Sequence, residues 1–424
     1  FSGINTQDSP IDLDPSFARI ADNCVIDSFG RIGARNGYEL LTTDATDLGG
    51  SIGTESLFEF IDQSGDIVVL SAANNKLFSG TTTLTELSSG TTITANNWKF
   101  ANLNNHCYLF QKGHESLIFT DASGSATLTK FSSFGSASGT APQANEVISA
   151  FGRLWAADVT GNQHTVFFSH LQIGYQWTGG SSGSLDITSV LPAGEDPIVA
   201  LAAHNGKLII FCRNTILIYA GATTPSSMTL EDTIVGVGCI ARDSVVSIGT
   251  DLLFLSDSGL RSLGRTIQEK SAAIGDLSQN VRNDLIGDIA TETGNIKSVY
   301  SPEHSFYLLA LPSNEKVYVF DISKVLPTGA FRVTTWSSIK PLCFVWERDG
   351  DLIFGRAGGI AKYSTFKDDD AAFTLQYFSN PLAFQQPANV KFLKKFNLTI
   401  IGGAATSVVF KWGYDYTEAY ETQN

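Results

Sequence analysis

The sequence predicts a mainly β protein built as a β-propeller of six or seven blades. Two observations support this prediction: a composition suited to short strands, and a strand–turn–strand unit that recurs at the spacing of a propeller blade. The chain has 424 residues, 43% of them hydrophobic, with 39 Gly, 28 Phe and a single Met. Aromatic residues favour strands and Gly favours tight turns, so this composition is typical of sheets rather than helical bundles.

Seven copies of the recurring unit can be aligned. Each runs from an apolar strand through a turn rich in Gly, Asn, Asp or Ser into a second apolar strand. The copies begin at Leu57, Trp98, Val147, Val199, Val245, Val299 and Leu342. Their first turns, at Gly65, Asn105, Gly152, Gly206, Thr250, His304 and Gly350, are separated by 40, 47, 54, 44, 54 and 46 residues. This is the period of a propeller blade, in which neighbouring units bury the faces that one unit alone leaves exposed.

The repeat divides the chain into three parts. We expect an N-terminal segment over residues 1–50, the propeller over 51–366, and a C-terminal β region over 367–424, with the two end segments forming a platform-like region. Periodicity leaves open whether six or seven copies close the ring. An irregular β-sandwich is the alternative fold, since no WD or kelch signature is present.

One segment departs from the strand pattern. Leu277, Val281, Leu285 and Ile289 recur at four-residue steps and predict a helix that starts near Asp276 or Ser278. It lies between the fifth and sixth copies, in an interval of only 54 residues, so we expect it to replace a strand. We expect no other substantial helix after residue 50.

The end segments carry weaker patterns. Residues 17–23 are compatible with a short helix, and residues 30–38 predict two strand-like pieces. After a linker-like charged turn at 367–373, residues 373–382 and 391–416 predict strands of a further β unit.

Charge argues against a protein that grips DNA. The net charge is −14, with 8 acidic and 3 basic residues in 1–50, 28 and 20 in 51–366, and 6 and 5 in 367–424. Such a surface repels phosphate instead of binding it by counterion release. The simpler interpretation of the excess is solubility.

The cysteines and the hydropathy pattern bear on compartment. Cys24, Cys107, Cys212, Cys239 and Cys343 are odd in number and form no CxxC or CxxH pattern, which disfavours a disulfide framework or a zinc site. We interpret them as buried thiols of a protein assembled in a reducing compartment such as bacterial cytoplasm. No apolar run approaches the roughly 20 residues of a membrane span, and the start lacks the form of a signal peptide.

No catalytic, cofactor-binding or metal-binding residue stands out, and we expect no enzyme activity and no cofactor. The histidines belong to no HExxH or HxH cluster. Asp62, Ser64 and Asp66, and separately Asp368, Asp369 and Asp370, offer oxygen ligands, but neither group matches a calcium loop and both are expected to be solvated turns. The histidines are His106, His114, His164, His170, His204 and His304.

Two further local features have ordinary interpretations. Residues 256–259, Ser-Asp-Ser-Gly, resemble the Asp-box turn of sialidase propellers, but the tryptophan that packs on that turn is absent and there is one copy. Lys391, Lys394 and Lys395 form the one local basic cluster, interpreted as a solvated strand edge or as a contact with a subunit or adaptor. No GxSxG elbow or GxxxxGK[ST] loop occurs.

Three motifs in order resemble the tail nozzle proteins of short-tailed bacteriophages, also described as tail tubular protein B-like or packaged-DNA stabilisation proteins. The first is the N-terminal series formed by Gly3-Ile4-Asn5, Pro10 and Pro15, Ala18 to Asn23, and Arg31-Ile32-Gly33 with Arg35 and Gly37. The second is the segment 274–285, IGDLSQNVRNDL, and the third is Trp336. With the repeats, these motifs cover most of residues 1–365.

The resemblance implies a structural virion protein of the phage tail. Its expected form is a homo-oligomeric ring, typically a hexamer, assembled in the host cytoplasm, that retains the genomic DNA and then conducts it without sequence-specific binding. The implied partners are a phage adaptor or portal-side protein, tail fibres or a needle, and indirectly the host envelope. An acidic channel wall would let DNA slide without adhering.

Two other classes of function remain open. One is a carbohydrate-binding or glycan-cleaving propeller, such as a receptor-binding depolymerase, which requires acids with arginines or a metal at one mouth of the ring. The other is a scaffold propeller that binds protein partners as a closed monomer. The end segments favour the ring-forming subunit over the monomeric scaffold.

Overall fold

The computed structural model describes most of the chain. Its described residues are 1–9, 13–42, 53–62, 64–122, 125–192, 194–269 and 276–382, followed by 390, 392, 394–395, 397, 399–401, 407–413 and 421–423. Pro10 and Lys391 lie outside them.

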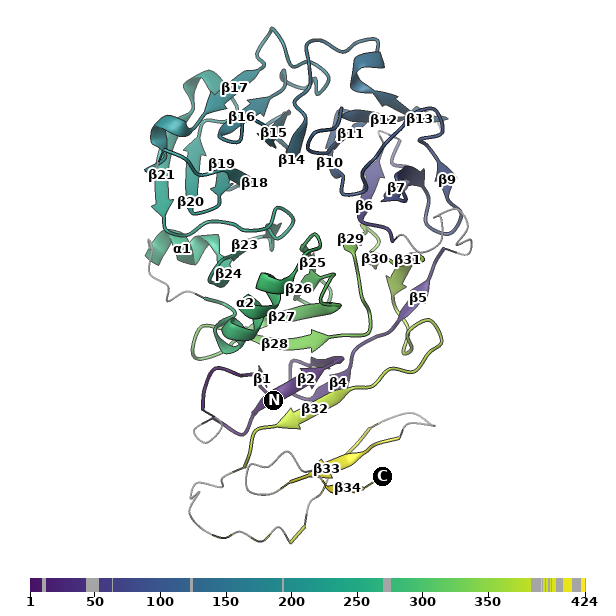
Figure 1. The fold of residues 1–424 in the computed structure, drawn as a ribbon, viewed down its shortest axis with the longest axis vertical. Coiled ribbons are helices and arrows are strands. Elements are labelled where there is room, and N and C mark those ends of the chain that lie inside the picture. The colour runs from purple at the N-terminus through teal and green to yellow at the C-terminus, as the bar shows by residue number, and fades with distance from the viewer. Residues whose placement is uncertain are drawn as a thin grey trace.

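The protein is a β-propeller whose sheets are arranged around a ring (Figure 1). Five sheets contain four strands in the order of a propeller meander, one contains three, and a seven-stranded sheet contributes four strands, β25 to β28, as a further blade. We number the blades along the chain, each from its innermost strand outwards. Blade 1 is β6 (Ser56–Ile61), β7 (Ile67–Ala73), β8 (Lys76–Ser79) and β9 (Thr85–Glu86); blade 2 is β10 (Lys99–Leu103), β11 (His106–Phe110), β12 (Leu117–Ala122) and β13 (Ser125–Lys130); blade 3 is β14 (Ala144–Ala150), β15 (Arg153–Val159), β16 (Thr165–Phe168) and β17 (Gly183–Asp186).

The remaining blades complete the ring. Blade 4 is β18 (Ile198–His204), β19 (Lys207–Cys212), β20 (Thr215–Ala220) and β21 (Thr229–Val235); the three-stranded blade 5 is β22 (Val246–Ser247), β23 (Leu252–Ser256) and β24 (Gly259–Ser262); blade 6 is β25 (Lys297–Ser301), β26 (Phe306–Leu311), β27 (Lys316–Val325) and β28 (Phe331–Trp336); blade 7 is β29 (Cys343–Trp346), β30 (Leu352–Arg356), β31 (Gly359–Tyr363) and β5 (Tyr38–Leu40).

Hydrophobic clusters between neighbouring blades hold the ring together. Seven clusters of buried residues form the core, and each joins two adjacent blades, including blade 7 with blade 1. Between blades 1 and 2, for example, Phe60 packs edge-on against Phe119, with ring centroids 5.3 Å apart. The predicted radial packing is confirmed, because each sheet buries its two faces against two different neighbours.

The turns explain why the repeat is visible in the sequence. Asn104 and Asn105 between β10 and β11 both have positive φ, at 48° and 65°, and so do Asn205 and Gly206 between β18 and β19, at 48° and 74°. Two successive residues with positive φ form the hairpin turns that match strand twist, and Asn and Gly tolerate that conformation best. The predicted turns at these two positions are confirmed.

The N-terminus closes the ring. Strand β5 pairs antiparallel with β31, with Tyr38 opposite Tyr363 and Leu40 opposite Ala361. The outer strand of the last blade therefore comes from the segment assigned to residues 1–50. Joining the two ends of the repeat in one sheet covers an edge that would otherwise be exposed.

Helical structure follows blade 5. The helix α2 (Arg282–Thr291) is preceded by a 3₁₀ turn, η5 (Gln279–Val281), and another helix, α1 (Leu263–Glu269), directly follows β24. Leu277, Val281 and Leu285 are fully buried between blades 5 and 6. A helix is present in the predicted interval, but it begins at Arg282 instead of near Asp276 or Ser278, and Leu277 and Val281 lie before it. Blade 5 has three strands, and α1, which follows the last of them, was not predicted. Further 3₁₀ turns are η1 (Phe131–Ser133), η2 (Thr188–Val190) and η3 (Pro225–Ser227).

The prediction of a helix over residues 17–23 is wrong. Residues Phe17–Asp22 form strand β2, which pairs with β1 (Gly3–Ile4), with β32 (Gln376–Ser379) and, through Asp22 and Thr335, with β28. Pairing on both sides overrides the local preference. The strands predicted within 30–38 are observed as β4 (Ile32–Ala34), which pairs with β3 (Cys24–Ile26), and as the start of β5.

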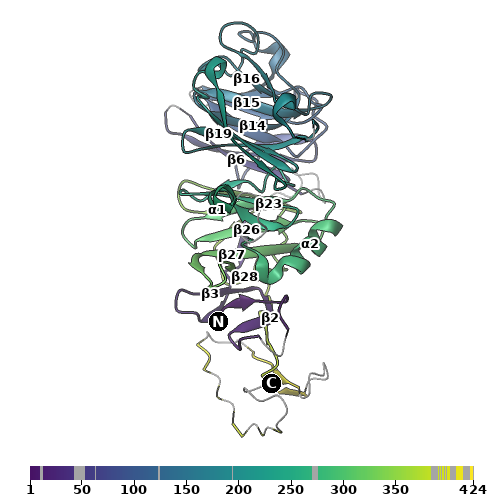
Figure 2. The same ribbon diagram turned by 90° about the vertical axis from the view of Figure 1, so that its left-hand side faces the viewer.

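We call β1–β4, β32 and the described residues after 379 the basal region. It lies along one side of the ring, beyond blade 6, and contains the N-terminus and the last described residues (Figures 1 and 2). Its last described pairing joins β33 (Phe410–Trp412) with β34 (Glu421–Gln423). Among the described residues, no helix has the length and apolar character required to span a membrane.

Candidate functional site

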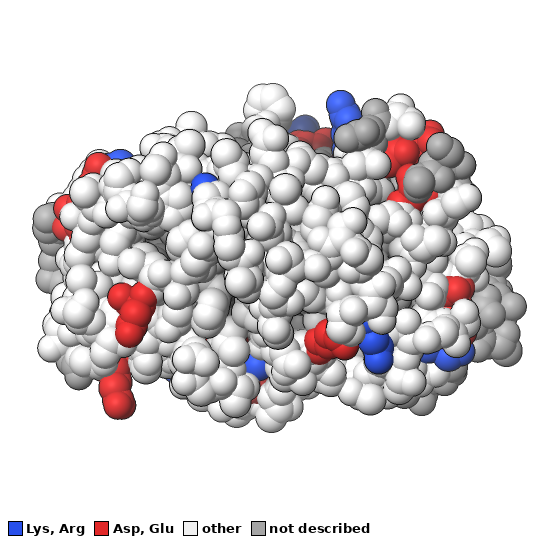
Figure 3. Space-filling model, turned by 90° about the horizontal axis from the view of Figure 1, so that it is seen from above, with Lys and Arg blue, Asp and Glu red and all other residues white. Residues whose placement is uncertain are grey.

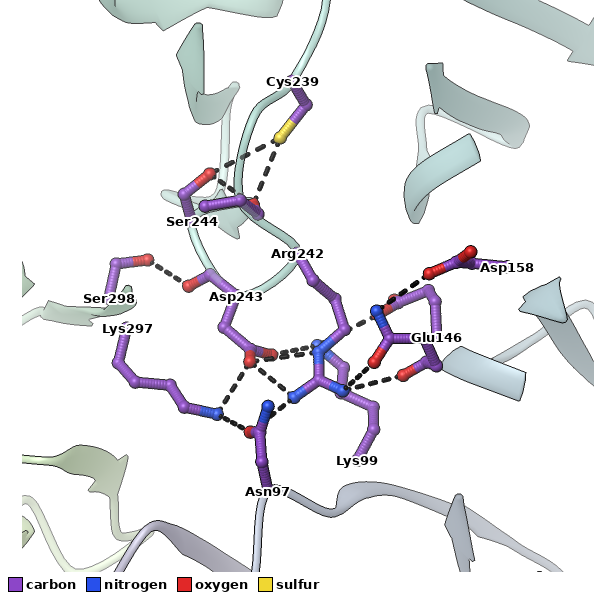
Figure 4. Close-up of polar contacts among 12 residues, drawn as sticks. Asn97, Lys99, Glu146, Asp158, Cys239, Arg242, Asp243, Ser244, Lys297 and Ser298 are labelled. Atoms are coloured by element: carbon purple, nitrogen blue, oxygen red, sulfur yellow. Dashed lines mark hydrogen bonds and ion pairs between the residues drawn. The ribbon is translucent and has the colours of Figure 1, made fainter. Parts of the chain in front are cut away.

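The main concentration of buried charge lies on the axis of the ring, and we call it the axial cluster (Figure 4). Lys99 begins β10 of blade 2, Glu146 lies in β14 of blade 3, and Lys297 begins β25 of blade 6. Arg242 and Asp243 belong to residues 240–245, the axial loop, which leads into β22 of blade 5. The innermost strands of three blades and the axial loop thus bring three cations and two carboxyl groups together.

Asp243 is the centre of the cluster. Its Oδ2 accepts hydrogen bonds from Arg242 Nη2 at 2.6 Å and from Lys297 Nζ at 2.7 Å, while its Oδ1 accepts one from Lys99 Nζ at 2.9 Å. Burial alone would raise the pKa of this carboxyl, but the charges of Arg242, Lys297 and Lys99 outweigh burial and hold its pKa well below the usual value. Asp243 is therefore ionised near neutral pH.

Arg242 and Lys297 connect opposite sides of the ring. Arg242 Nη1 donates to the backbone oxygen of Asn145 at 2.7 Å, and Arg242 Nη2 donates to Asn97 Oδ1 at 2.8 Å. Lys297 Nζ donates to the same Asn97 oxygen at 2.5 Å. Because blades 2 and 3 are thereby bonded directly to blade 6 and the axial loop, protein fills the axis of the ring at this level.

The backbone of the axial loop is fixed to blade 6. Ser298 donates to the backbone oxygen of Asp243 from both its N–H, at 3.0 Å, and its hydroxyl, at 2.7 Å. The hydroxyl of Tyr307 donates to the backbone oxygen of Ser244 at 2.8 Å. These bonds position Asp243 independently of its side-chain partners.

Glu146 is the least satisfied member of the cluster. It is 1% exposed, and its Oε2 lies 3.5 Å from Lys99 Nζ without a hydrogen-bond partner among the described residues. Burial raises the pKa of this carboxyl to about 7, and the charge of Asp243 adds to the effect, while Lys99 and Arg242 oppose it. A pKa near neutrality suits a general acid or base, but protein encloses this carboxyl on all sides, which favours a structural role.

The two lysines respond differently to burial. For Lys99, the charges of Asp243 and Glu146 outweigh the effect of burial, so its pKa is raised. For Lys297, burial outweighs the charge of Asp243, so its pKa is lowered. Beside them, Lys112 Nζ binds Asp158 Oδ1 at 2.5 Å, and Asn145 joins that pair to the cluster by donating to Asp158 Oδ2 at 3.0 Å.

A second carboxylate group lines a cavity of about 430 Å³ between blades 1 and 7. Glu59, Glu347 and Asp349 lie on its wall with Ile67 and several Ser, Thr and Gly residues. Partial burial raises the pKa of Glu347 to about 7, with added repulsion from Glu59, Asp351 and Asp349. Another cavity, of about 420 Å³, lies against the basal region beside Asp22 and Asp368.

The acidic and serine residues weighed in the sequence are not among those that line either carboxylate site. Asp62 and Asp66 close a hydrogen-bonded turn, in which Asp66 N–H donates to Asp62 Oδ1 at 2.8 Å. Ser256 and Ser258 stabilise the β23–β24 turn, with their hydroxyl oxygens 3.0 Å apart. Among the described residues, no three His, Cys, Asp or Glu side chains are placed to hold a metal ion. The five cysteines are buried free thiols.

Asp368 corrects one expectation. Asp369 and Asp370 are exposed as expected, but Asp368 is 7% exposed and accepts two hydrogen bonds from Arg35, Nη1 to Oδ1 at 2.9 Å and Nη2 to Oδ2 at 2.6 Å. The ion pair makes burial of this carboxylate tolerable. Lys394 and Lys395 are exposed.

None of the five charged members of the axial cluster was singled out in the sequence. Apart from the adjacent Arg242 and Asp243, they come from distant parts of the chain, so no short motif connects them. The sequence signal was a charged residue at or near the start of an innermost strand, ahead of an apolar one: Lys99 precedes Phe100, Glu146 precedes Val147, and Lys297 lies two residues before Val299.

Comparison with known proteins places the chain in no family. No protein-family model matches it, and no curated protein matches it. Among solved structures, it resembles the computationally designed Ika8 protein with a TM-score of 0.43 and 12% identity, over 77% of this chain and 99% of that chain. The propeller fold rests on the sheet order and the seven interblade clusters described above.

Proposed function

We propose that this protein is a non-enzymatic structural subunit of the tail nozzle of a short-tailed bacteriophage, and that copies of it form a ring around a channel for DNA. The observation that carries the proposal is the distribution of exposed apolar side chains. Eleven of the 15 large exposed hydrophobic residues in the described part of the chain lie in the first 29 residues or from residue 366 onwards. They are Phe1, Ile20, Phe29, Phe366, Leu382, Val390, Phe392, Ile400, Ile401, Val408 and Val409.

This distribution supports assembly through one end of the molecule. Phe29 is 83% exposed, Phe366 89% and Ile401 92%. Apolar side chains gathered this way are typical of surfaces that a partner covers. A ring of identical subunits would cover them with neighbouring copies, through contacts that close after a fixed number of subunits. A hexamer is the number that the sequence resemblance implies.

The axial cluster bears on where DNA would pass. Because Arg242 and Lys297 are bonded across the axis of the propeller, the bore of one propeller is filled at that level. A channel for DNA would therefore lie between subunits, around the axis of the oligomer.

Charge supports passage of DNA without adhesion. The chain has a net charge of −14, and each lysine or arginine contact with a phosphate would add to retention. The outer edge of the propeller at the end away from the basal region is mostly uncharged, with only scattered lysine, arginine and carboxylate groups (Figure 3). Neither feature suits a protein that binds DNA tightly.

The motif residues behind the resemblance pack where the N-terminal segment joins the ring. The backbone of Gly3 lies so close to Val333 that a Cβ atom would come within 2.7 Å of the Val333 carbonyl oxygen. Trp336 Nε1 donates to the backbone oxygen of Cys24 at 3.1 Å, and Arg35 binds Asp368. These contacts explain why the motif positions need these residue types, and they suit a rigid ring subunit.

Native mass spectrometry and electron microscopy of the full chain, alone and with the phage adaptor, test this proposal. We expect closed rings whose formation depends on protein concentration. A monomer that stays single at high concentration and with the adaptor, and that cleaves glycans, would refute the nozzle proposal.

A second candidate function, binding or cleavage of a glycan, is favoured by one observation. The cavity between blades 1 and 7 holds Glu347, whose pKa is raised to about 7, beside Glu59. A carboxyl group with a raised pKa beside a second carboxyl group is the arrangement that glycosidases use. Screening phage-receptor glycans against the wild type and a Glu347→Gln variant tests this candidate, since cleavage that is lost in the variant would support it.

A further inference from the structure

Lys99 lies between two carboxyl groups, and it is hydrogen bonded to only one of them. Its Nζ is 2.9 Å from Asp243 Oδ1 and 3.5 Å from Glu146 Oε2, so it is hydrogen bonded to the first and only near the second. The Glu146 oxygen has no other hydrogen-bond partner among the described residues. Of the three cations in the cluster, Lys99 has the most exposed side chain, at 25%, which leaves its long stem room to move.

Asp243 can release Lys99 without becoming an unpaired buried charge. Its other oxygen retains Arg242 at 2.6 Å and Lys297 at 2.7 Å. Glu146 has no cation at such a short distance, although the charge of Arg242 and the backbone N–H of Leu201 also favour its ionised form. An ionised Glu146 would therefore compete with Asp243 for the ammonium group, and the outcome would decide which contact holds β10 to the axis.

The groups around Glu146 cause its carboxyl to ionise near neutral pH. Burial is the main reason that its pKa is raised to about 7, and Asp243 adds to the shift. Protonated, the carboxyl has no charge with which to attract Lys99; ionised, it does. The charged and titratable groups around it are Lys99, Arg242, Asp243, Lys297, Asp158 with its partner Lys112, and Cys239.

We propose that Lys99 exchanges partners with pH, pairing with Asp243 when Glu146 is protonated and with Glu146 when Glu146 is ionised. The proton leaves the Glu146 carboxyl for solvent, and no covalent bond of the chain changes. In the protonated state, Lys99 connects β10 of blade 2 to the axial loop. In the ionised state that connection is lost, while the bonds from Ser298 and Lys297 keep the loop attached to blade 6.

Hydrogen–deuterium exchange of the full chain, corrected for the intrinsic effect of pH, tests the exchange of partners. At about pH 6 we expect strong protection of the amides in residues 99–103 and 240–245, and at about pH 8.5 a loss of protection of about tenfold. Glu146→Gln, which is uncharged at every pH, should retain the strong protection at both values. Glu303→Gln, which removes an exposed carboxylate elsewhere, should behave as the wild type.

Lys99→Met provides an independent second variant. Without the ammonium group, the connection to Asp243 is absent at either pH, so protection of residues 240–245 should be low and nearly independent of pH. The proposal is overturned if the wild type shows no pH dependence in these segments. It is also overturned if Glu146→Gln or Lys99→Met retains the wild-type pH dependence of amide protection. Because there are two variants, the test remains decisive if one of them does not fold.

Discussion

Arg35 and Asp368 are 333 positions apart in the chain and form a buried ion pair through two parallel hydrogen bonds. The Arg35 side chain is fully buried, and its Nε donates to Asn23 Oδ1 at 3.1 Å. Phe373 covers the guanidinium group from 4.1 Å. The pair thus fixes the segment that leaves the last blade to the segment that enters the ring.

Removing one partner of this pair should be costly. We expect Arg35→Ala to lower the free energy of unfolding by about 3–5 kcal/mol, because Asp368 would be left as an uncompensated buried charge. Urea denaturation followed by tryptophan fluorescence measures the change. Arg31→Ala is the matched control, since Arg31 pairs with Asp27 at the surface with its side chain 70% exposed, and should leave the midpoint unchanged. Equal effects of the two variants would contradict this account.

Loss of the central carboxylate should destabilise the propeller. Asp243→Asn would leave Arg242, Lys99 and Lys297 close together without their common counter-charge, and we expect a loss of about 3–5 kcal/mol in the free energy of unfolding. Asp257→Asn, at an exposed turn position, is the control. Calorimetry of both variants measures the difference, and an Asp243→Asn protein as stable as the wild type would show that the cluster is not ionised as described.

Glu146 predicts how stability varies with pH. Its pKa is raised from 4.5 to about 7 in the folded protein, so the folded state holds this proton more tightly than the unfolded chain. The resulting stabilisation is complete below pH 4.5 and is lost as pH rises through about 7. Urea midpoints measured across this range should fall with pH in the wild type and fall less in Glu146→Gln. Parallel curves would contradict the prediction.

Asp243 should act in the opposite direction. Because its pKa in the folded protein lies well below the usual 3.8, its stabilisation is present above that value and is lost as pH falls below it. Acid unfolding of the wild type should therefore begin below about pH 4. The acid limb of the stability curve, recorded by circular dichroism, checks this, and a wild type that keeps full stability far below that pH would speak against it.

Two glycines of the N-terminal motif should differ in their tolerance of a methyl group. A Cβ atom on Gly37 would lie 1.9 Å from the backbone oxygen of Lys367, whereas one on Gly33 would meet nothing within 4 Å. We expect Gly37→Ala to cost about 1–3 kcal/mol through the backbone shift it forces, and Gly33→Ala to cost little. Thermal unfolding of the two proteins measures the contrast, which would be absent if the segments were not packed as described.

Assembly should depend on the basal region. Ile401→Asp places a charge on a side chain that is 92% exposed, so we expect normal stability of the subunit but loss of rings. Val235→Asp, on the outer strand of blade 4 and 48% exposed, is the matched control and should still assemble. Native mass spectra of the two variants show which of them still forms rings. Rings of normal size from Ile401→Asp would place the contact elsewhere.

Local patterns predicted most of the propeller. Turns such as Asn104-Asn105 and Asn205-Gly206 have residue types that tolerate positive φ. The apolar stripe that includes Leu285 predicted a helix in the interval that contains α2, although α2 begins at Arg282. Each signal spans a few residues, so sequence alone is sufficient to detect it.

Long-range contacts account for what the sequence did not reveal. Leu40 pairs with Ala361, which is distant in the chain, so the origin of the outer strand of blade 7 could not be predicted from local sequence. Residues 17–22 form strand β2 because β1 and β32 lie beside them, and the local pattern does not contain that information. The axial cluster depends on the ring bringing Lys99 and Lys297 together. Such contacts are set by how the blades close, and periodicity leaves that closure unspecified.

The origin of β5 has a consequence for biosynthesis. Blade 7 takes β5 from near the start of the chain and β29, β30 and β31 from the end of the repeat, so the ribosome must synthesise the chain through Tyr363 before the ring can close. Until then, the nascent protein is an open arc with an unpaired strand at its first end. Any chaperone or early contact that shields residues 38–40 during translation would therefore influence the yield of propellers in which blade 7 is complete.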